Sequence, residues 1–405
     1  MHREVSALEH ENNSYIYVKA KIPYWRLSGF YFFYFATLGG FLPFWSLYLQ
    51  DNGFNAAQIG ELTALMVGTK IIGPNLWGWI ADHTGKSLRV IRIASFFAML
   101  LFAGFLYQKT FQWFALVTVG FSFFWNAALP QFEAATLHHL KNEPHRYSHI
   151  RLWGSIGFII SVLGVGYFLD LYPIALLPWL IVALLASIWL VSLLTPEISS
   201  AKASQAAVGI WQIVKQPEVL AFLCVYMLLQ AAHGPYYVFF SIYLKQFEYS
   251  STLIGLLWSL GAGAEIIVFI MMRQLLKYVS LRTILRISAL LSVLRWLLIA
   301  WYAGDMHILI AAQILHAATF GTAHVAAIYL VQNYFGVHHQ GKGQALYSSL
   351  SFGLGGMLGG LYSGYAWDIF SGQWVFSFAA LLSAVAYIMT VIWVGKGKAY
   401  CHKTS

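Results

Sequence analysis

Long apolar stretches, separated by short polar connections, follow one another along almost the whole chain. Each stretch has 19 to 28 residues, and a helix of about 20 residues can cross the hydrocarbon core of a bilayer. The pattern predicts an all-α membrane protein with 12 transmembrane helices, and an even number of crossings puts both termini on one side. The expected crossings are 25–49, 57–81, 90–108, 111–137, 148–170, 173–195, 217–244, 251–272, 281–302, 307–334, 343–366 and 370–395.

The two halves of the chain resemble each other. Residues 46–72 align without gaps to residues 241–267, and ten of the 27 positions are identical. A weaker repeat at an offset of 198 pairs Gly157, Gly166, Tyr167 and Asp170 with Gly355, Gly364, Tyr365 and Asp368. Six crossings per half give the repeats the same orientation in the membrane. We therefore expect two pseudo-symmetric six-helix bundles, with a cavity where they meet.

Polar stretches divide the chain around these bundles. We expect a cytoplasmic N-terminal segment at 1–24, a first bundle at 25–195 and a second bundle at 217–395. The Ser- and Ala-rich stretch 196–216 fits a cytoplasmic linker, and 396–405 a cytoplasmic tail.

Composition and charge support a membrane location. The chain is 59% hydrophobic and 10% charged, whereas soluble domains carry about 25% charged residues. Twenty of the 24 Lys and Arg lie in the termini or in even-numbered connections. This is the asymmetry of a multi-pass protein of the cytoplasmic membrane with both termini cytoplasmic. The net charge of +9 thus reports topology and implies no nucleic-acid partner.

Six titratable side chains lie roughly midway along apolar stretches. A charged group at the centre of a bilayer costs about 2.5 kcal/mol or more, so such groups face a cavity and carry function. The pattern is typical of a transporter with a polar site at its midplane. The six are Lys70, His233, Glu265, Arg295, His316 and His324.

Glu265 is the candidate proton carrier, because opening and closing a cavity changes how readily a carboxyl group binds a proton. The alternative is a structural ion pair with Arg295 or Lys70 that only offsets burial. Arg295 suits a counter-ion or a carboxylate anchor, since its planar fork binds carboxylates bidentately. Lys70 could anchor an anionic substrate, pair with Glu265 or extend towards the membrane surface.

Histidines titrate near neutral pH, which suits proton exchange, although a single histidine in a helix is more often a packed residue. His316 and His324 share one helix face with Gln313, which indicates cavity lining. The spacing of these histidines and of His233 fits no zinc site. The two cysteines, Cys224 and Cys401, exclude a disulfide framework. We expect no metal and no cofactor, with the proton as coupling ion.

Aromatic residues beside the polar positions are candidates for substrate contact. They are Trp153, Tyr236, Tyr237 and Trp258. Gly234 and Pro235 follow His233 directly, so we expect a helix break there. An aromatic cavity with a cation suits an aryl carboxylate and equally a sugar stacked on Trp. The glycine-rich run 353–360 predicts close helix packing.

The connection after the second crossing reads GWIADHTGKSLRVIR. It resembles the signature loop of the major facilitator superfamily. This resemblance implies a latch that holds the cytoplasmic side closed. His83 replaces the usual arginine, and the alternative is an ordinary basic loop. The latch residues are Gly78, Asp82, Gly85, Lys86 and Arg89.

Three longer sequence segments indicate a narrower family. RLWGSIGF at 151–158, LWSLGAGAEIIVF at 257–269 and QILHAATFGTAH at 313–324 resemble the 3-phenylpropionate transporter family, a proton-symporter branch near lactose permease. The resemblance implies the major facilitator fold and proton-driven uptake of a small organic molecule such as an aromatic acid.

Lactose permease also suggests roles for individual residues. Its sugar-binding Glu and Arg on helices four and five correspond to Glu133 and Arg151, although the positive-inside bias also explains Arg151. Its coupling group on helices eight to ten corresponds to Glu265, Arg295 and His316. A carboxylate beyond its helix-ten histidine is replaced here by Thr319.

The sequence thus predicts proton-coupled symport of a small organic substrate, with the lipid bilayer as surroundings and a monomer as the working unit. The alternative is an uncoupled facilitator or an exporter of a sugar, nucleoside or drug-like molecule, motivated by Thr319. A non-transporting sensor would use the same pocket, but nothing resembles a signalling domain. An enzyme is not expected, because no nucleophile-elbow, HExxH or P-loop motif occurs.

Overall fold

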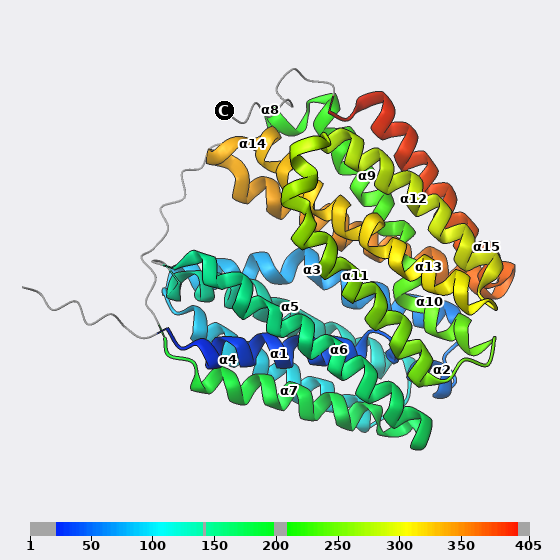
Figure 1. Ribbon diagram of the computed structural model, residues 1–405. Helices are drawn as coiled ribbons and strands as arrows, with labels where there is room; N and C mark the ends of the chain where they lie inside the picture. Colours follow the sequence, from blue (N-terminus) through cyan, green and yellow to red (C-terminus); the bar gives the residue numbers. More distant parts are fainter. Residues whose placement is uncertain (1–21, 141–142, 198–208, 396–405) are drawn as a thin grey trace, which may run out of the picture.

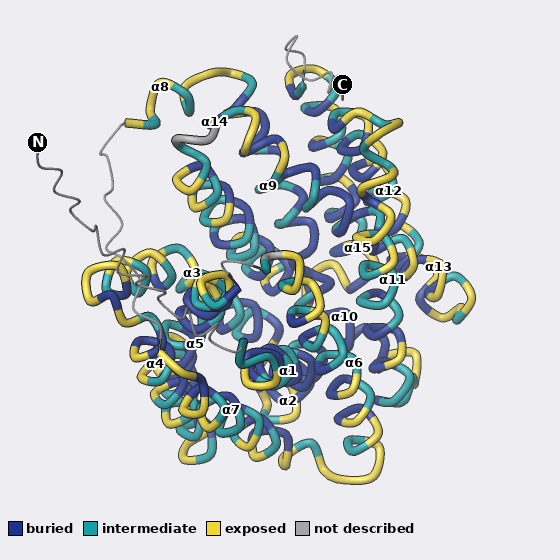
Figure 2. The backbone as a smooth tube through the Cα atoms, turned by 60° about the vertical axis from the view of Figure 1, so that its left-hand side comes forward, coloured by how far each residue is buried: buried dark blue, intermediate teal, exposed yellow. Residues whose placement is uncertain are grey.

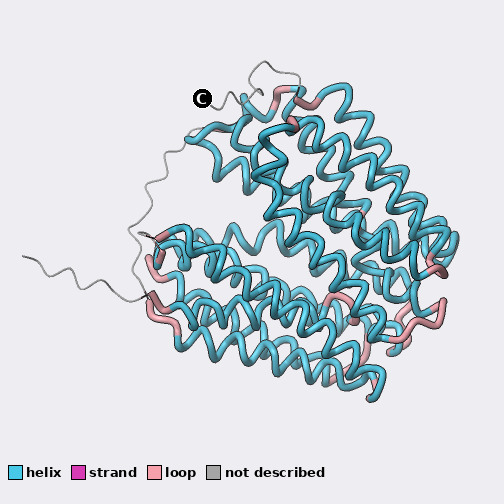
Figure 3. Tube along the Cα trace, viewed as in Figure 1, coloured by secondary structure: helices cyan, strands magenta, loops and turns pink. Residues whose placement is uncertain are grey.

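The computed structural model describes residues 22–140, 143–197 and 209–395, and every regular element in these ranges is a helix (Figure 3). The first half contains α1 (Tyr24–Phe41), α2 (Trp45–Asp51), α3 (Ala56–Thr84), α4 (Ser87–Phe102), α5 (Phe111–His139), α6 (Tyr147–Leu171) and α7 (Leu177–Leu194). The second half contains α8 (Trp211–Val214), α9 (Pro217–Ala232), α10 (Gly234–Lys245), α11 (Ser251–Tyr278), α12 (Leu281–Tyr302), α13 (Met306–His316), the π-helix η4 (Ala317–Gly321), α14 (Thr322–Ser348), the π-helix η5 (Ser349–Gly355) and α15 (Gly356–Trp393).

The helices of the first half gather in the lower part of Figure 1 and those of the second half in the upper part. The main contacts between the halves join α3 to α15, η5 and α10, α6 to α11, and α2 to α10. Within the first half α1 packs on α6 and α4 on α5, and within the second α12 packs on α15 and α9 on α15. Of the expected polar segments, 1–21, 198–208 and 396–405 lie outside the described residues.

Ten segments of the described chain are long and apolar enough to cross a membrane. The chain is therefore an all-helical protein with the composition of a multi-pass membrane protein. Helix α3 is not among the ten, and one of the ten, His339–Trp393, has 55 residues with a non-helical Ser371 inside it. The count of twelve and the two-bundle arrangement stay predictions.

The surface of the molecule is apolar. Large hydrophobic side chains are strongly exposed along the outer faces of the helices, among them Leu116, Ile270 and Ile369 at 65%, 75% and 72%. Exposed and buried segments alternate along the helices in Figure 2, as expected for helices with one face towards the interior. A soluble protein rarely exposes so much contiguous apolar surface, whereas lipid tails accept it.

The expected break at Gly234 and Pro235 is confirmed. Helix α9 ends at Ala232, α10 begins at Gly234, and His233 lies between them. The first crossing of the first half is divided in the same way, because α1 ends at Phe41 and α2 begins at Trp45. Both halves thus begin with an interrupted helix, in agreement with the internal repeat.

Glycines allow backbones to approach closely where helices cross. A Cβ on Gly359 would lie 2.7 Å from the carbonyl oxygen of Ala231, and one on Gly355 2.6 Å from that of Met227. The glycine-rich run 353–360 therefore packs tightly, as predicted from its small residues. On the opposite face of the same helix, a Cβ on Gly364 would lie 2.8 Å from the carbonyl oxygen of Ala56.

One contact between the halves was not foreseen. The Asp170 carboxylate at the end of α6 accepts hydrogen bonds from the backbone N–H groups of Ser251, at 2.6 Å, and Thr252, at 2.9 Å. These N–H groups open α11 and have no partner inside the helix. The negative charge also suits the positive end of the helix dipole. Asp170 therefore fastens α6 to the start of α11.

Two glycines of α6 provide a test of the packing. A Cβ on Gly157 would fall on the backbone of Phe32 in α1, whereas one on Gly164 would meet no atom within 4 Å. We predict that Gly157→Ala lowers the free energy of unfolding by about 1–3 kcal/mol through overpacking. Gly164→Ala should be neutral or stabilising, because alanine favours a helix over glycine.

The measurement is the thermal unfolding midpoint of both variants in the same detergent, followed by tryptophan fluorescence. Equal midpoints for the two variants would contradict the close crossing of α1 and α6.

Candidate functional site

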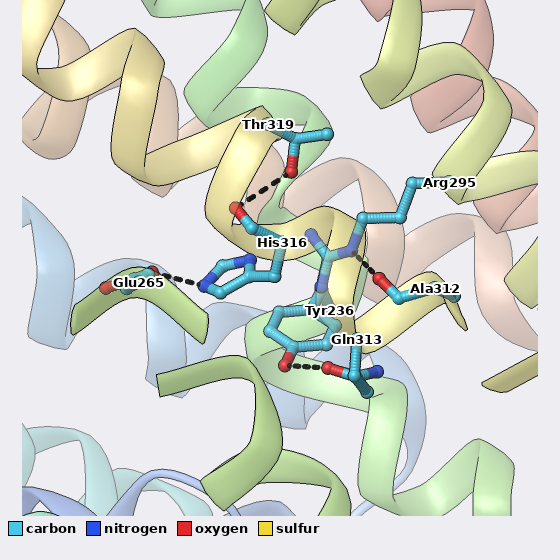
Figure 4. Close-up of polar contacts among 7 residues, drawn as sticks. All are labelled: Tyr236, Glu265, Arg295, Ala312, Gln313, His316 and Thr319. Carbon is cyan, nitrogen blue, oxygen red and sulfur yellow. Dashed lines mark hydrogen bonds and ion pairs between the residues drawn. The ribbon is translucent and has the colours of Figure 1, made fainter. Parts of the chain in front are cut away.

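A carboxylate and a histidine meet midway along crossings of the second half (Figure 4). Oε1 of Glu265 on α11 lies 2.7 Å from Nε2 of His316, the last residue of α13. Glycines make room for the pair, since a Cβ on Gly261 would come within 3.4 Å of the His316 ring and one on Gly321 within 3.6 Å of Glu265 Cγ. The side chain of Glu265 is 19% exposed and that of His316 is 8% exposed. An acid and an imidazole in contact can exchange one proton.

Arg295 in α12 is fully buried, and Figure 4 shows it on the side of the His316 ring away from Glu265. Its Cζ lies 4.4 Å from the ring centroids of both Tyr236 and Trp296, and its Nε donates to the carbonyl oxygen of Ala312 at 3.0 Å. Two aromatic faces attract the cation and partly replace the water it has lost. Arg295 is therefore a fixed positive charge, held in place by packing.

The alternative structural ion pair for Glu265 is not formed. The described structure pairs Glu265 with His316 and neither with Arg295 nor with Lys70. Figure 4 shows the His316 ring between the Glu265 carboxylate and the Arg295 guanidinium. The carboxylate therefore has a titratable partner in place of a permanent cation.

His233 occupies the break between α9 and α10. Its Nδ1 lies 2.7 Å from the carbonyl oxygen of Leu229, and its ring meets the Trp296 ring edge-on at 4.9 Å. A carbonyl oxygen only accepts, so Nδ1 carries the hydrogen and the neutral ring presents Nε2 as an acceptor. The His233 and His316 rings are 6.0 Å apart, so the structure brings these two predicted residues together.

His316 and His324 lie on one face, as predicted, with Phe320 between them. The Phe320 ring stacks on His316 at 5.4 Å and on His324 at 6.2 Å. Nδ1 of His324 lies 3.3 Å from the hydroxyl of Tyr347. Phe320 and Tyr347 were not foreseen; Phe320 could have been found by its spacing of four residues from each histidine.

Several polar atoms of this cluster have no hydrogen-bond partner among the described residues. Four of these residues are buried, with Arg295 and Gln313 at 0%, His233 at 2% and His316 at 7% exposed as whole residues. Most buried polar atoms in proteins are paired, so such a concentration marks a place where a ligand or water can bond. The atoms are Nη1 and Nη2 of Arg295, Nε2 of His233, Nε2 of Gln313 and Nδ1 of His316.

The aromatic candidates Tyr236, Tyr237 and Trp258 surround the same cluster. Tyr236 donates its hydroxyl hydrogen to Oε1 of Gln313 at 2.8 Å and packs on Trp258 at 4.6 Å. Tyr237 stacks on His233 at 5.9 Å. Tyr236 and Trp258 are buried, while Tyr237 is partly exposed.

The expectation that Trp153 neighbours the mid-span residues is wrong. Its Nε1 donates to the hydroxyl of Tyr24 at 3.2 Å, and its ring meets Trp25 at 5.6 Å. Both partners stand at the beginning of α1. Trp153 therefore helps to fix the start of the first crossing.

Glu133 on α5 and Arg151 on α6 approach each other in the first half. Oε1 of Glu133 lies 4.0 Å from Nε of Arg151, and both side chains are about a third exposed. The Arg151 Cζ also lies 3.9 Å from the centroid of the Phe35 ring. The expected ion pair between Glu133 and Arg151 is present, with a distance at the upper limit for an ion pair.

Lys70 lies midway along α3 and is exposed. No hydrogen bond or ion pair joins it to the part of the chain that the structure describes. Beside it a polar network connects α3 to α5, in which Thr69 donates to Ser122 at 3.0 Å and Asn126 donates to Thr69 at 2.8 Å. Lys70 is thus separate from the Glu265 cluster.

The proposed latch lies at the end of α3. Gly85 ends this helix in the left-handed conformation with φ 64°, and a Cβ on Gly78 would lie 3.3 Å from Nε2 of Gln131. Asp82, Lys86 and Arg89 are exposed. Among the described residues Asp82 forms no ion pair, so its expected pairing with a nearby cation is not made in this structure.

Thr319 is buried and its hydroxyl donates to the carbonyl oxygen of His316 at 3.3 Å. It offers no carboxylate to the site. Within the described ranges no group of three His, Cys, Asp or Glu side chains could hold a metal ion.

Comparison with known proteins agrees with this architecture. The model of the MFS_1-like family matches residues 24–378. A probable 3-phenylpropionic acid transporter of Escherichia coli K12 is 31% identical over 370 residues, covering 89% of this chain and 95% of that protein. The maltose permease of Geobacillus stearothermophilus is 26% identical, with 89% and 92% covered.

Solved structures agree on the fold. The crystal structure of the nucleoside transporter NupG superposes with a TM-score of 0.81 at 20% identity, over 91% of this chain and 98% of that one. The family model, which spans most of the chain, and the 31% identical relative lead to one conclusion. The chain belongs to the MFS_1-like family and is a transporter of the major facilitator type.

Proposed function

We propose that the protein imports a small organic acid together with protons, by alternating access. The observation that carries this proposal is the partly exposed contact between Glu265 and His316 in the middle of the crossings. An aromatic acid such as 3-phenylpropionate is the favoured substrate. The relative named for that acid and the aromatic surroundings of the cluster support this choice.

The topology is part of the proposal. The ten apolar segments, together with α3 and a division of α15 at Ser371, give twelve crossings. Two six-helix bundles, 25–195 and 217–395, would rock against each other around the central cavity. The distribution of Lys and Arg supports a location in the bacterial cytoplasmic membrane with cytoplasmic termini. We propose a monomer that needs no cofactor besides the coupling proton.

In this mechanism Glu265 exchanges the proton and His316 holds its carboxylate. Arg295 stays charged and favours the ionised carboxylate when the two approach. Opening the cavity to one side or the other changes the water around Glu265, and with it the affinity for the proton. Substrate would lie beside the unpaired polar atoms of His233 and Gln313.

An uncoupled facilitator or an exporter of a sugar, nucleoside or drug-like molecule is the second candidate. Thr319 motivates it, because no carboxylate occupies that position. The names of two relatives, a maltose permease and a putative nucleoside transporter, support neutral substrates elsewhere in the family.

Uptake of labelled 3-phenylpropionate into proteoliposomes separates the two candidates. We predict accumulation with an inward proton gradient and only equilibration after the gradient is collapsed. Equal uptake in both conditions would favour the facilitator. An absence of uptake in both would remove the aryl-acid substrate.

The variant Glu265→Gln keeps the shape of the side chain and removes its ability to bind and release a proton. Gradient-driven accumulation should fall to the level reached without a gradient, while exchange of internal for external substrate continues. The matched control is Glu248→Gln, in the exposed connection between α10 and α11. If Glu265→Gln accumulates substrate like the wild type, the coupling role of Glu265 is wrong.

A further inference from the structure

Two of the helix contacts between the halves are copies of each other. Where α3 meets α15, a Cβ on Gly60 would lie 2.6 Å from the carbonyl oxygen of Gly360. Where α11 meets α6, a Cβ on Gly255 would lie 2.8 Å from the carbonyl oxygen of Val162. Gly60 and Gly255 are related by the offset of the first sequence repeat, and Val162 and Gly360 by the offset of the second.

A further pair of contacts repeats this match one helical turn away. A Cβ on Gly364 would lie 2.8 Å from the carbonyl oxygen of Ala56, the first residue of α3. A Cβ on Gly166 would lie 2.6 Å from that of Ser251, the first residue of α11. Small residues permit such close approach of helix backbones. The same backbone contact is therefore used twice to join the halves.

The α6–α11 contact is also held by charge. Asp170, one turn beyond Gly166, accepts the backbone N–H groups of Ser251 at 2.6 Å and Thr252 at 2.9 Å. The ammonium group of Lys245, at the end of α10, attracts the same carboxylate. Asp170 belongs to the first half and these three residues belong to the second. The bonds therefore exist only while the halves are closed at this end.

The α3–α15 contact is fastened differently. Asp368 occupies the position on α15 that Asp170 has on α6, yet it is exposed and forms no hydrogen bond or ion pair with the described residues. The start of α3 is capped from within the first half by the side chain of Asn55. Here the halves are joined by the hydroxyl of Tyr365, which donates to Glu61. The two contacts thus share a backbone geometry, and one of them has a carboxylate on a helix start.

Both contacts lie at the extracellular end in the proposed topology. Helix α6 begins at Tyr147, after a basic even-numbered connection, and ends at Leu171 in an odd-numbered one. Helices α2 and α10 touch each other too, and both lie towards the right-hand side of Figure 1. Alternating access requires the halves to separate at this end when substrate enters from outside.

We propose that the α3–α15 and α6–α11 contacts form the extracellular gate and that Asp170 holds this gate closed. Its two hydrogen bonds stabilise the state closed to the outside and are lost when the gate opens, so they shift the balance between the two states. Asp368 has no such role, and the resistance to opening is concentrated where α6 meets α11. The inference rests on the two-bundle topology of the proposed function and is independent of the substrate.

Single-molecule energy transfer on the full chain in nanodiscs tests this assignment. The dyes are attached to Lys109→Cys and Gln373→Cys, exposed positions near the extracellular ends of different halves, after Cys224 and Cys401 are replaced by alanine. In Asp170→Asn the rate of change from the shorter to the longer distance should rise about tenfold, because an amide lacks the charge and cannot accept both N–H groups. The rate of return should change little, since the bonds form only after closure.

The variant Ser251→Pro removes the same interaction from the donor side. Proline has no N–H group and is tolerated at the first residue of a helix, so the gate should again open faster. The matched controls are Asp368→Asn and Ala56→Pro, the equivalent positions in the α3–α15 contact. Both controls should open at the rate of the wild type.

Equal opening rates in Asp170→Asn and the wild type would overturn the role of Asp170 and leave aryl-acid transport standing. Ser251→Pro decides the question in the same way if Asp170→Asn does not fold. The assignment is also wrong if Asp368→Asn opens as fast as Asp170→Asn, because the resistance is then shared by both contacts. If wild-type molecules show a single distance with and without 3-phenylpropionate, the rocking of the two halves falls and this inference falls with it.

Discussion

An unpaired polar group in hydrocarbon has no water to bond with, and this constraint governs the whole molecule. Hydroxyl groups inside the crossings accordingly donate to carbonyl oxygens one turn earlier, as Thr37 does to Phe33 and Ser292 does to Ser288. Arg295 meets the same constraint with two aromatic rings and a carbonyl. Pairing stays incomplete around His233 and Gln313, where the candidate site lies.

The helix positions could be predicted from sequence because lipid imposes length and apolarity directly. The break at His233 followed from Gly234 and Pro235, and the shared face of His316 and His324 followed from helical spacing. The resemblance to lactose permease grouped Glu265 with Arg295 and His316. Helical periodicity could not say which of the two contacts Glu265, because it gives the face of a residue and not the height of its neighbours on another helix.

Contacts between the two halves could not be predicted from the sequence either. Asp170 caps the start of α11, yet nothing in its own surroundings indicates a partner 81 residues away in the sequence. The opposite case is Trp153, whose position beside Arg151 suggested a central role until the fold placed it against Tyr24. Sequence thus identified the titratable side chains inside the crossings, and packing decided which of them meet.

The π-helices η4 and η5 have a further consequence for how the chain can vary in length. A π turn holds an additional residue, so all that follows is rotated by about 100° relative to a regular helix. Loss of one residue from Ala317–Gly321 would restore a regular helix and leave His324 on its present face, because the lost residue and the lost π turn compensate each other. These two turns are therefore places where a crossing can gain or lose one residue without rotating the helix that follows.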